Sequence, residues 1–202
     1  MSDAYGFLAP IYQPLSRLVF GKDLIEANQV FSALAYGKNI LILGGGDGMA
    51  YRDWDGNFFG EYWDTSSKMA DLARRNLGKS EIKVNLGGWP GTGKFDAVFL
   101  PFVLDSLPDE DIQIILSAIS NALKPGGKVV LSDFFPPKTF LQSSIQKLMI
   151  SGFRTFAKHP RTDLPDFDRF FSSGDWRLLD EKTWRKGWIR TRVYGRMEDS
   201  AH

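Results

Sequence analysis

The sequence has no cysteine among its 202 residues. Disulfide bonds, zinc sites built on thiolates and a cysteine nucleophile are therefore excluded. It also lacks a long apolar run, because the longest, from Ala97 to Leu104, is interrupted by Pro101 and is too short to span a bilayer. The first ten residues have no basic start followed by an apolar stretch, so we expect no secretory signal and a cytoplasmic protein.

The chain also lacks an excess of positive or negative charge. The chain has 25 Lys and Arg residues against 24 Asp and Glu residues, a formal net charge of +1, and its basic residues are spread out. Nucleic acid is not an expected partner, because phosphate binding requires a concentrated basic surface. The sequence also has no G-x-x-x-x-G-K-[ST] phosphate loop, no Ser-His-Asp arrangement and no convincing metal cluster. We therefore expect no metal.

Apolar runs and helical patterns alternate along the chain, which predicts one α/β domain. Helical patterns follow the capping residues 65–67 and occupy 108–124, and a turn is expected at 125–127. Two strand-like segments, 178–184 and 188–195, flank Arg185-Lys186-Gly187 and predict a closing antiparallel hairpin. The other expected strands are 39–43, 60–64, 81–86, 95–104 (ending near Pro101) and 128–134. This order predicts a mainly parallel sheet with helices on both faces.

The segment ILILGGGDG (40–48) places four glycines within five positions directly after a strand. Glycine permits a sharp turn and the close approach of a ligand, and a following helix would present free N–H groups. In open parallel sheets, ligands bind beyond the carboxyl ends of the strands. The loop therefore predicts a ligand site, with a tight structural turn as the alternative.

Asp64 ends the second expected strand, 20 residues (64 − 44) after Gly44. A carboxylate at this distance can accept hydrogen bonds from both hydroxyls of a ribose. The dinucleotide pattern G-x-G-x-x-G would need glycine at position 49, where the chain has Met49. An adenosine-containing ligand without phosphate therefore fits better than a dinucleotide, and a hydride-transferring dehydrogenase fits least.

Several segments in order resemble the motifs of class I S-adenosylmethionine-dependent methyltransferases. They are ILILGGGDG, YWDTSSKMADLARRNL (62–77), KFDAVFLPFVLDSLPDED (94–111) and LKPGGKVVLSDF (123–134). The leader YGFLAPIYQPLSRLVFG (5–21) is similar to the N-terminal segment of the branch that includes ubiquinone and menaquinone methyltransferases. The resembling segments lie between residues 5 and 134. One motif alone would be weak, whereas the ordered set is specific.

The resemblance implies a single domain over 1–202 with a three-layer Rossmann-like fold. Its seven-stranded mixed sheet would have the order 3-2-1-4-5-7-6, with strand 7 antiparallel and helices on both faces. Residues 1–37 would form a helical N-terminal cover and 135–175 a substrate lid. The cofactor would be S-adenosyl-L-methionine, the product S-adenosyl-L-homocysteine, and no metal would be needed.

The same resemblance assigns residues to the ligands. Those expected at the cofactor are Gly44, Gly46, Asp47, Gly48, Asp64, Thr65, Met69, Gly88, Trp89, Leu100, Pro101 and Phe102. Those expected at the acceptor are Tyr5, Tyr12, Phe140 and Phe153. For the two tyrosines, packing of the leader on the sheet is an equal alternative. For the helical segment 138–157, which carries Phe140 and Phe153, a core-packing role is the alternative to a lid.

The sequence departs from the family pattern in three places. The family often has an acid at the position of Ile42, and often has Gly-Asp where this chain reads Gly87-Gly88-Trp89. The Gly88 backbone could still bind adenine, with Trp89 stacked on it. Only 16 residues (64 − 48) join Gly48 to Asp64, which predicts that a turn at 53–57 replaces the end of the first helix.

The expected function is in-line methyl transfer to a small apolar or aromatic acceptor, for which the protein mainly aligns two ligands and excludes water. A base is needed only when the acceptor must lose a proton. His159 is the candidate, although we favour a surface or packing role for it, as we favour capping or solvent exposure for Asp105. Membrane contact is expected only if the acceptor is a lipid quinone, and the chain would be a monomer or homodimer.

Two other functions fit parts of the pattern. A non-catalytic S-adenosylmethionine-binding domain would explain the missing acids and the lack of an evident base. A spermidine synthase-like aminopropyltransferase shares the GGGDG loop, but such enzymes need acids after the fourth strand, where this chain is largely apolar apart from Asp105.

Overall fold

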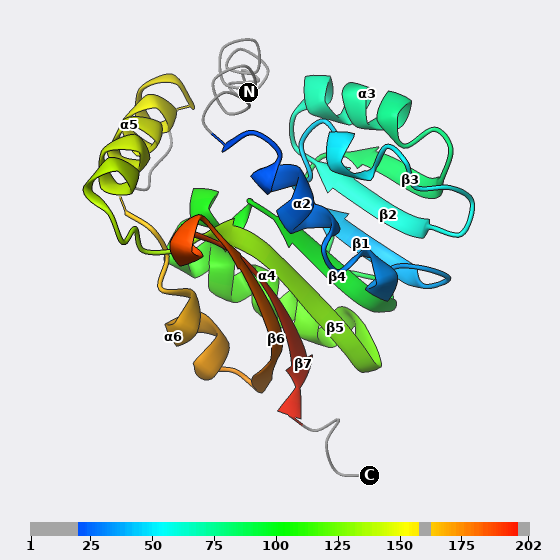
Figure 1. Cartoon of the computed structure of the whole chain (residues 1–202). Coiled ribbons are helices and arrows are strands. Elements are labelled where there is room, and N and C mark those ends of the chain that lie inside the picture. The colour runs from blue at the N-terminus through cyan, green and yellow to red at the C-terminus, as the bar shows by residue number, and fades with distance from the viewer. Residues whose placement is uncertain (1–19, 158–162, 198–202) are drawn as a thin grey trace.

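The computed structural model describes residues 20–157 and 163–197, with the backbone alone for 151–157 (Figure 1). One seven-stranded sheet runs in the order β3-β2-β1-β4-β5-β7-β6. The strands are β1 (Asn39–Leu43), β2 (Phe59–Asp64), β3 (Glu81–Leu86), β4 (Phe95–Pro101), β5 (Leu123–Phe134), β6 (Trp176–Trp184) and β7 (Ile189–Arg196). Strand β7 pairs antiparallel with β5 and β6, and the other pairs are parallel. The predicted strand order is confirmed.

The central strands are apolar without alternation because both faces of the sheet are covered. In β1, Leu41 and Leu43 pack into the cluster on the α4 and α6 side, whereas Ile40 and Ile42 pack into the cluster that includes Tyr62. Figure 1 shows α2 in front of the sheet and α4 behind it, which gives the predicted three layers. The helices are α2 (Asp23–Gln29), α3 (Ser67–Asn76), α4 (Asp109–Ala122), α5 (Phe140–Ala157) and α6 (Phe167–Ser172).

Local sequence signals account for the helix starts. The Ser66 side chain caps α3 by accepting a hydrogen bond from the Met69 N–H. Helix α4 follows Pro108 and has three acidic residues in its first turn, where they favour the positive end of the helix dipole. The predicted hairpin is also present, with a short 3₁₀ turn, η4 (Arg185–Gly187), between β6 and β7.

Two expectations differ from the structure. The glycine loop is followed by a single 3₁₀ turn, η2 (Met49–Tyr51), rather than by an α-helix. In the segment that follows this turn, buried Trp54 stacks on Phe58 with ring centroids 4.3 Å apart and packs into the cluster that contains Ile40 and Ile42. The irregularity expected at 125–127 lies inside β5, which begins earlier than predicted, at Leu123: Leu123 pairs with Phe95, Lys128 pairs with Ala97, and Gly126 between them has a positive φ of 74°.

Helix α5 stands apart from the sheet, on the side where β5 ends and β7 begins (Figure 1). Its inner side is apolar, with Ile145 and Met149 packed against a cluster that contains Phe134 and Trp188. Within residues 20–157 and 163–197, no helix combines the length and apolar character needed to cross a bilayer.

Candidate functional site

A cavity of about 960 Å³ lies at the carboxyl ends of the parallel strands. The ends of β1, β2, β4 and β5 and the loops after β1, β3 and β4 form its floor and walls, and helices α2 and α5 contribute side chains. The α2 contribution is Leu24, Ile25 and Asn28, and the α5 contribution is Gln146, Met149 and Ile150. The cavity therefore occupies the place where an open parallel sheet binds its ligands.

The four glycines of the loop do different things. A Cβ on Gly44 would lie 2.4 Å from Val103 Cγ2, and one on Gly45 would lie 2.6 Å from the Tyr62 hydroxyl. A Cβ on Gly48 would lie 3.2 Å from the Ala73 backbone in α3. Only at Gly46 in this loop does the same test find open space, at a positive φ of 65°. Three of the glycines thus make room for the protein itself, and Gly46 opens towards the cavity that it lines.

Two side chains of β2 form hydrogen bonds with the glycine loop. The Tyr62 hydroxyl donates a hydrogen bond of 2.7 Å to the Gly46 carbonyl. The Asp64 carboxylate accepts hydrogen bonds from the Gly46 N–H at 3.1 Å and the Ser66 N–H at 2.9 Å. Burial, and then the negative charge of Asp64, raises the pKa of Tyr62 well above its ordinary value, so the phenol stays a donor. The loop and the cap of α3 are joined through one carboxylate.

Most of the residues expected at the cofactor line this cavity. They are Gly44, Gly46, Asp47, Asp64, Thr65, Met69, Gly88, Trp89, Pro101 and Phe102. The Trp89 indole donates to the Thr92 carbonyl at 3.1 Å and meets Phe95 edge to face, which fixes its ring beside the loop after β3. Phe102 has a positive φ of 53°, an uncommon conformation for a bulky residue, and its ring lies 5.2 Å from that of Phe134.

The structure places the remaining predicted residues elsewhere. Gly48 packs against α3, and Leu100 is fully buried in the core between the sheet and α4; neither lines the cavity. Phe140 begins α5 with 89% of its side chain exposed, also outside the lining. Tyr5, Tyr12 and His159 lie outside the described residues, as does the side chain of Phe153.

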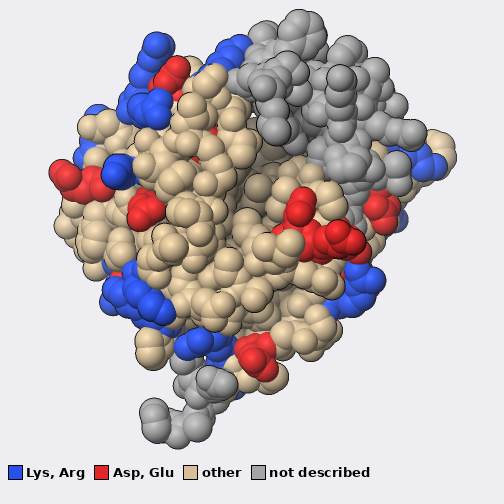
Figure 2. All heavy atoms as spheres, turned by 180° about the vertical axis from the view of Figure 1, so that it is seen from behind, with Lys and Arg blue, Asp and Glu red and all other residues tan. Residues whose placement is uncertain are grey.

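Several lining residues escaped the sequence prediction. Asn28 of α2 and Trp188 after η4 lie outside every motif, and Phe134 ends the motif at 123–134 but was not assigned to a ligand. Asp105, Asp111 and Asp163 also line the cavity, in addition to the expected Asp47 and Asp64. The described part of the lining contains no Lys or Arg. On the face seen in Figure 2, the largest group of acidic side chains lies beside a hollow near the middle of the view. The charges that line the described cavity are therefore negative, which suits a cationic ligand.

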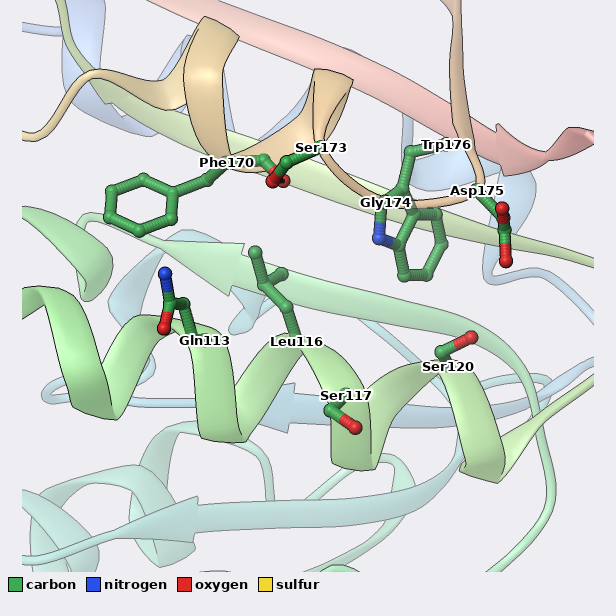
Figure 3. A pocket seen from close by; sticks show the side chains of 9 residues that line it. All are labelled: Gln113, Leu116, Ser117, Ser120, Phe170, Ser173, Gly174, Asp175 and Trp176. Carbon is green, nitrogen blue, oxygen red and sulfur yellow. Dashed lines mark hydrogen bonds between the residues drawn. The ribbon is translucent and has the colours of Figure 1, made fainter.

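A second, smaller cavity of about 250 Å³ lies between α4 and the segment from α6 to β6 (Figure 3). Its apolar side consists of Leu116, Phe170 and Trp176, and its other lining residues are Gln113, Ser117, Ser120, Ser173, Gly174 and Asp175. None of the residues expected at cofactor or acceptor lines it. The chemistry predicted from the sequence thus concerns the larger cavity.

Residues 41–131 match the family model of the methyltransferase domain. This segment contains the glycine loop, Asp64, Trp89 and the end of β4, which are the parts that form the cavity floor. This match identifies a methyltransferase domain within residues 41–131 and supports the resemblance to class I S-adenosylmethionine-dependent methyltransferases. Comparison with curated proteins gives no significant match.

Solved structures share the fold of this methyltransferase domain at low sequence identity. The mitomycin 7-O-methyltransferase MmcR is 21% identical with a TM-score of 0.64, and the alignment covers 95% of this chain but only 60% of MmcR. The structure of a DhpI–SAH complex is 17% identical with a TM-score of 0.66, over 95% of this chain and 93% of DhpI. A chain from the complex between the Haloferax volcanii Trm112 methyltransferase activator and a putative methyltransferase is 17% identical with a TM-score of 0.69, over 96% and 98% of the two chains.

The residues of the larger cavity fit S-adenosylmethionine, the cofactor that the resemblance implies. Gly46 presents backbone without a Cβ in the way, and Asp64 places a carboxylate at the same point of the cavity. Thr65 and Met69 follow on the α3 side, and beyond β4 the cavity is lined by apolar residues together with Asp105 and Asp111. A ligand with a polar nucleoside end and a sulfonium at its centre matches this distribution.

Proposed function

We propose that the protein is an S-adenosylmethionine-dependent methyltransferase that acts on a small apolar or aromatic acceptor. The observation that carries this proposal is the division of one cavity into two parts. The glycine loop and Asp64 form one part, and Phe102, Phe134 and Trp188 form the other. An acceptor seated beside this aromatic cluster would face a cofactor held by the loop.

The proposed mechanism needs alignment more than acid–base chemistry. When bound, the cofactor supplies a methyl group activated by a sulfonium. Gly46 and Asp64 would hold its adenosine part, and Trp89 would border the adenine. Phe102 and Phe134 would keep water away from the reacting atoms and orient the acceptor. No catalytic base is assigned, because an acceptor atom that has no proton to lose needs none.

Titration calorimetry with S-adenosylmethionine and S-adenosylhomocysteine tests the cofactor. We expect both to bind, NAD not to bind, and Asp64→Asn to weaken binding about 10- to 100-fold because a charged acceptor towards the ribose is lost. Asp64→Asn retains the shape of the side chain, which matters because Asp64 also holds the Gly46 and Ser66 N–H groups. Asp71→Asn, on the exposed side of α3, is the matched control.

The acceptor and the two rival functions require a second measurement. Transfer of a labelled methyl group into compounds of a metabolite extract would support the enzyme, and fractionation would identify the acceptor. Cofactor binding without any transfer would favour a non-catalytic binding domain. Preference for the decarboxylated cofactor would favour aminopropyl transfer. If the folded protein bound neither S-adenosylmethionine, S-adenosylhomocysteine nor the decarboxylated cofactor, all three functions would be contradicted.

A further inference from the structure

The turn after β4 lies between the two parts of the larger cavity. This turn is the 3₁₀ element η3 (Leu104–Ser106), and Val103 precedes it. Val103 packs on the glycine loop so closely that a Cβ on Gly44 would lie 2.4 Å from its Cγ2 atom. The Phe102 ring, one residue earlier, lies 5.2 Å from the ring of Phe134. The turn therefore adjoins the glycine loop on one side and the aromatic cluster on the other.

Asp105 is the carboxylate that this turn brings to the cavity. Its side chain is partly exposed, and it lines the cavity together with Ser106. Asp133, at the end of β5, is fully buried and does not line the cavity. The Asp133 carboxyl group accepts hydrogen bonds from the Asp105 N–H at 3.3 Å and the Phe134 N–H at 2.8 Å. The turn that carries Asp105 is thereby attached to the buried end of β5.

The negative charge of these two neighbouring carboxyl groups resides on Asp105. Burial, and then the charge of Asp105, raises the pKa of Asp133 well above its ordinary value. Asp133 therefore holds a proton more tightly than an exposed aspartate, and the charge stays on the member of the pair that lines the cavity. The other carboxylates of the described lining are Asp111 of α4, Asp163 before α6, and Asp47 and Asp64 at the cofactor end. A carboxylate between cofactor and acceptor is placed to take a proton from the acceptor.

We propose that Asp105 is the proton acceptor in methyl transfer and that the methyl acceptor reacts through a hydroxyl or N–H group. The reacting oxygen or nitrogen bonds to the methyl carbon while the carbon–sulfur bond breaks. The electron pair of that bond goes to sulfur, which becomes the neutral thioether of S-adenosylhomocysteine, and the proton of the acceptor goes to the Asp105 carboxylate. The inference rests on the proposed function and narrows its acceptor to compounds whose reacting atom carries a proton.

Titration calorimetry with two cofactor analogues tests the position of Asp105. S-adenosylhomocysteine has a neutral sulfur, whereas sinefungin carries a protonated amino group where the transferred methyl group would be. We expect Asp105→Asn to weaken sinefungin binding about tenfold and S-adenosylhomocysteine binding less than twofold, because only sinefungin places a cation at the transfer point. Glu110→Gln is the matched control, at an exposed position of α4 outside the cavity lining, and it should bind both compounds as the wild type does.

The pH dependence of methyl transfer tests the role of Asp105 as a base. The measurement is the rate of label transfer from saturating S-adenosylmethionine into a metabolite extract between about pH 6 and 9. We expect Asp105→Asn to be about 100-fold slower than the wild type at neutral pH, and the deficit to shrink as rising pH removes the proton of the acceptor without a base. Thermal melting shows whether the variant folds, and Asp105→Ser is the second variant if it does not.

Three results would overturn the inference. One is an equal change, or no change, in the affinities of Asp105→Asn for sinefungin and S-adenosylhomocysteine. Another is a transfer rate of Asp105→Asn that is unchanged or is lowered by the same factor at every pH, as a structural defect would produce. Both leave binding and transfer by the wild type intact, and with them the proposed function. The third is a wild-type protein that binds neither analogue or transfers no label, which would contradict the proposed function as well.

Discussion

At the scale of single residues, the glycine loop is shaped mainly by its neighbours within the protein. Gly45 has an ordinary backbone conformation, but Tyr62 lies where its Cβ would be. Tyr62 cannot withdraw easily, because it is fully buried and its hydroxyl is bonded to the Gly46 carbonyl. The conformation of the cofactor loop therefore depends on an aromatic residue of the neighbouring strand.

Gly45→Ala tests this dependence. We expect it to lower the free energy of unfolding by about 1–3 kcal/mol, because a methyl group is forced into a packed site. Urea denaturation provides the measurement. Gly56→Ala is the control, since Gly56 has open space around it and no positive φ; it should be neutral or stabilise by about 0.4–1 kcal/mol. Equal values for the two variants would show that Tyr62 does not restrict the loop.

At the scale of elements, α5 presents apolar residues on two sides with different environments. Met149 and Ile145 pack against Phe134 and Trp188, and Met149 also lines the cavity. Phe140, Leu141 and Leu148 on the other side have between 66% and 89% of their surface exposed. The helix start is fixed by Gln142, whose side chain accepts from the Lys138 N–H at 2.8 Å and donates to the Arg185 carbonyl at 2.7 Å.

A pair of alanine substitutions distinguishes the two sides of α5. Met149→Ala should lower the free energy of unfolding by about 1–2 kcal/mol, since it removes partly buried methylene and thioether groups. It should also raise the KM of an identified acceptor. Phe140→Ala should change stability by less than about 0.5 kcal/mol and leave KM unchanged. Denaturation and steady-state kinetics measure both, and a KM effect confined to Phe140→Ala would contradict this account of α5.

At the scale of the whole molecule, the carboxyl groups of Glu181 and Asp133 change the free energy of unfolding in opposite directions as pH changes. Burial raises the pKa of Glu181, but hydrogen bonds and charges from Arg192 and Arg190 outweigh it, and the net pKa is lowered. Asp133 is fully buried at the end of β5, where burial and then the charge of Asp105 raise its pKa well above the ordinary value. Its carboxyl group also accepts from the N–H groups of Phe134 at 2.8 Å and Asp105 at 3.3 Å.

The sign of each contribution follows from linkage. Glu181 binds its proton less tightly when folded, so its stabilising contribution is lost as pH falls through the folded pKa. Asp133 binds its proton more tightly when folded, so its contribution is largest below the ordinary aspartate pKa of about 4 and is lost as pH rises through the folded pKa.

Asp133→Asn isolates the Asp133 contribution, because the amide oxygen can still accept from backbone N–H groups. We expect the variant to gain stability relative to the wild type as pH rises from about 4 to 8, by about 1.4 kcal/mol for each unit of pKa shift that this range covers. Denaturation at a series of pH values measures the difference. A gap that is constant with pH would show that Asp133 titrates as it does in the unfolded chain.

Local patterns in the sequence determined the sheet and one end of the site. Buried strands read as apolar runs, Ser66 marks the start of α3, and the glycine loop with Asp64 marks the carboxyl edge of β1 and β2. These signals are local because backbone conformation, capping and strand burial are decided by neighbouring residues. The strand order came from the resemblance, and the structure confirms it.

Only the tertiary structure decided which residues meet across the cavity. Asn28, Phe134 and Trp188 come from three distant segments, and no spacing in the sequence relates them. Helical periodicity shows which residues share a side of α5 but not which side meets the core, so Phe140 was expected at the acceptor and lies exposed.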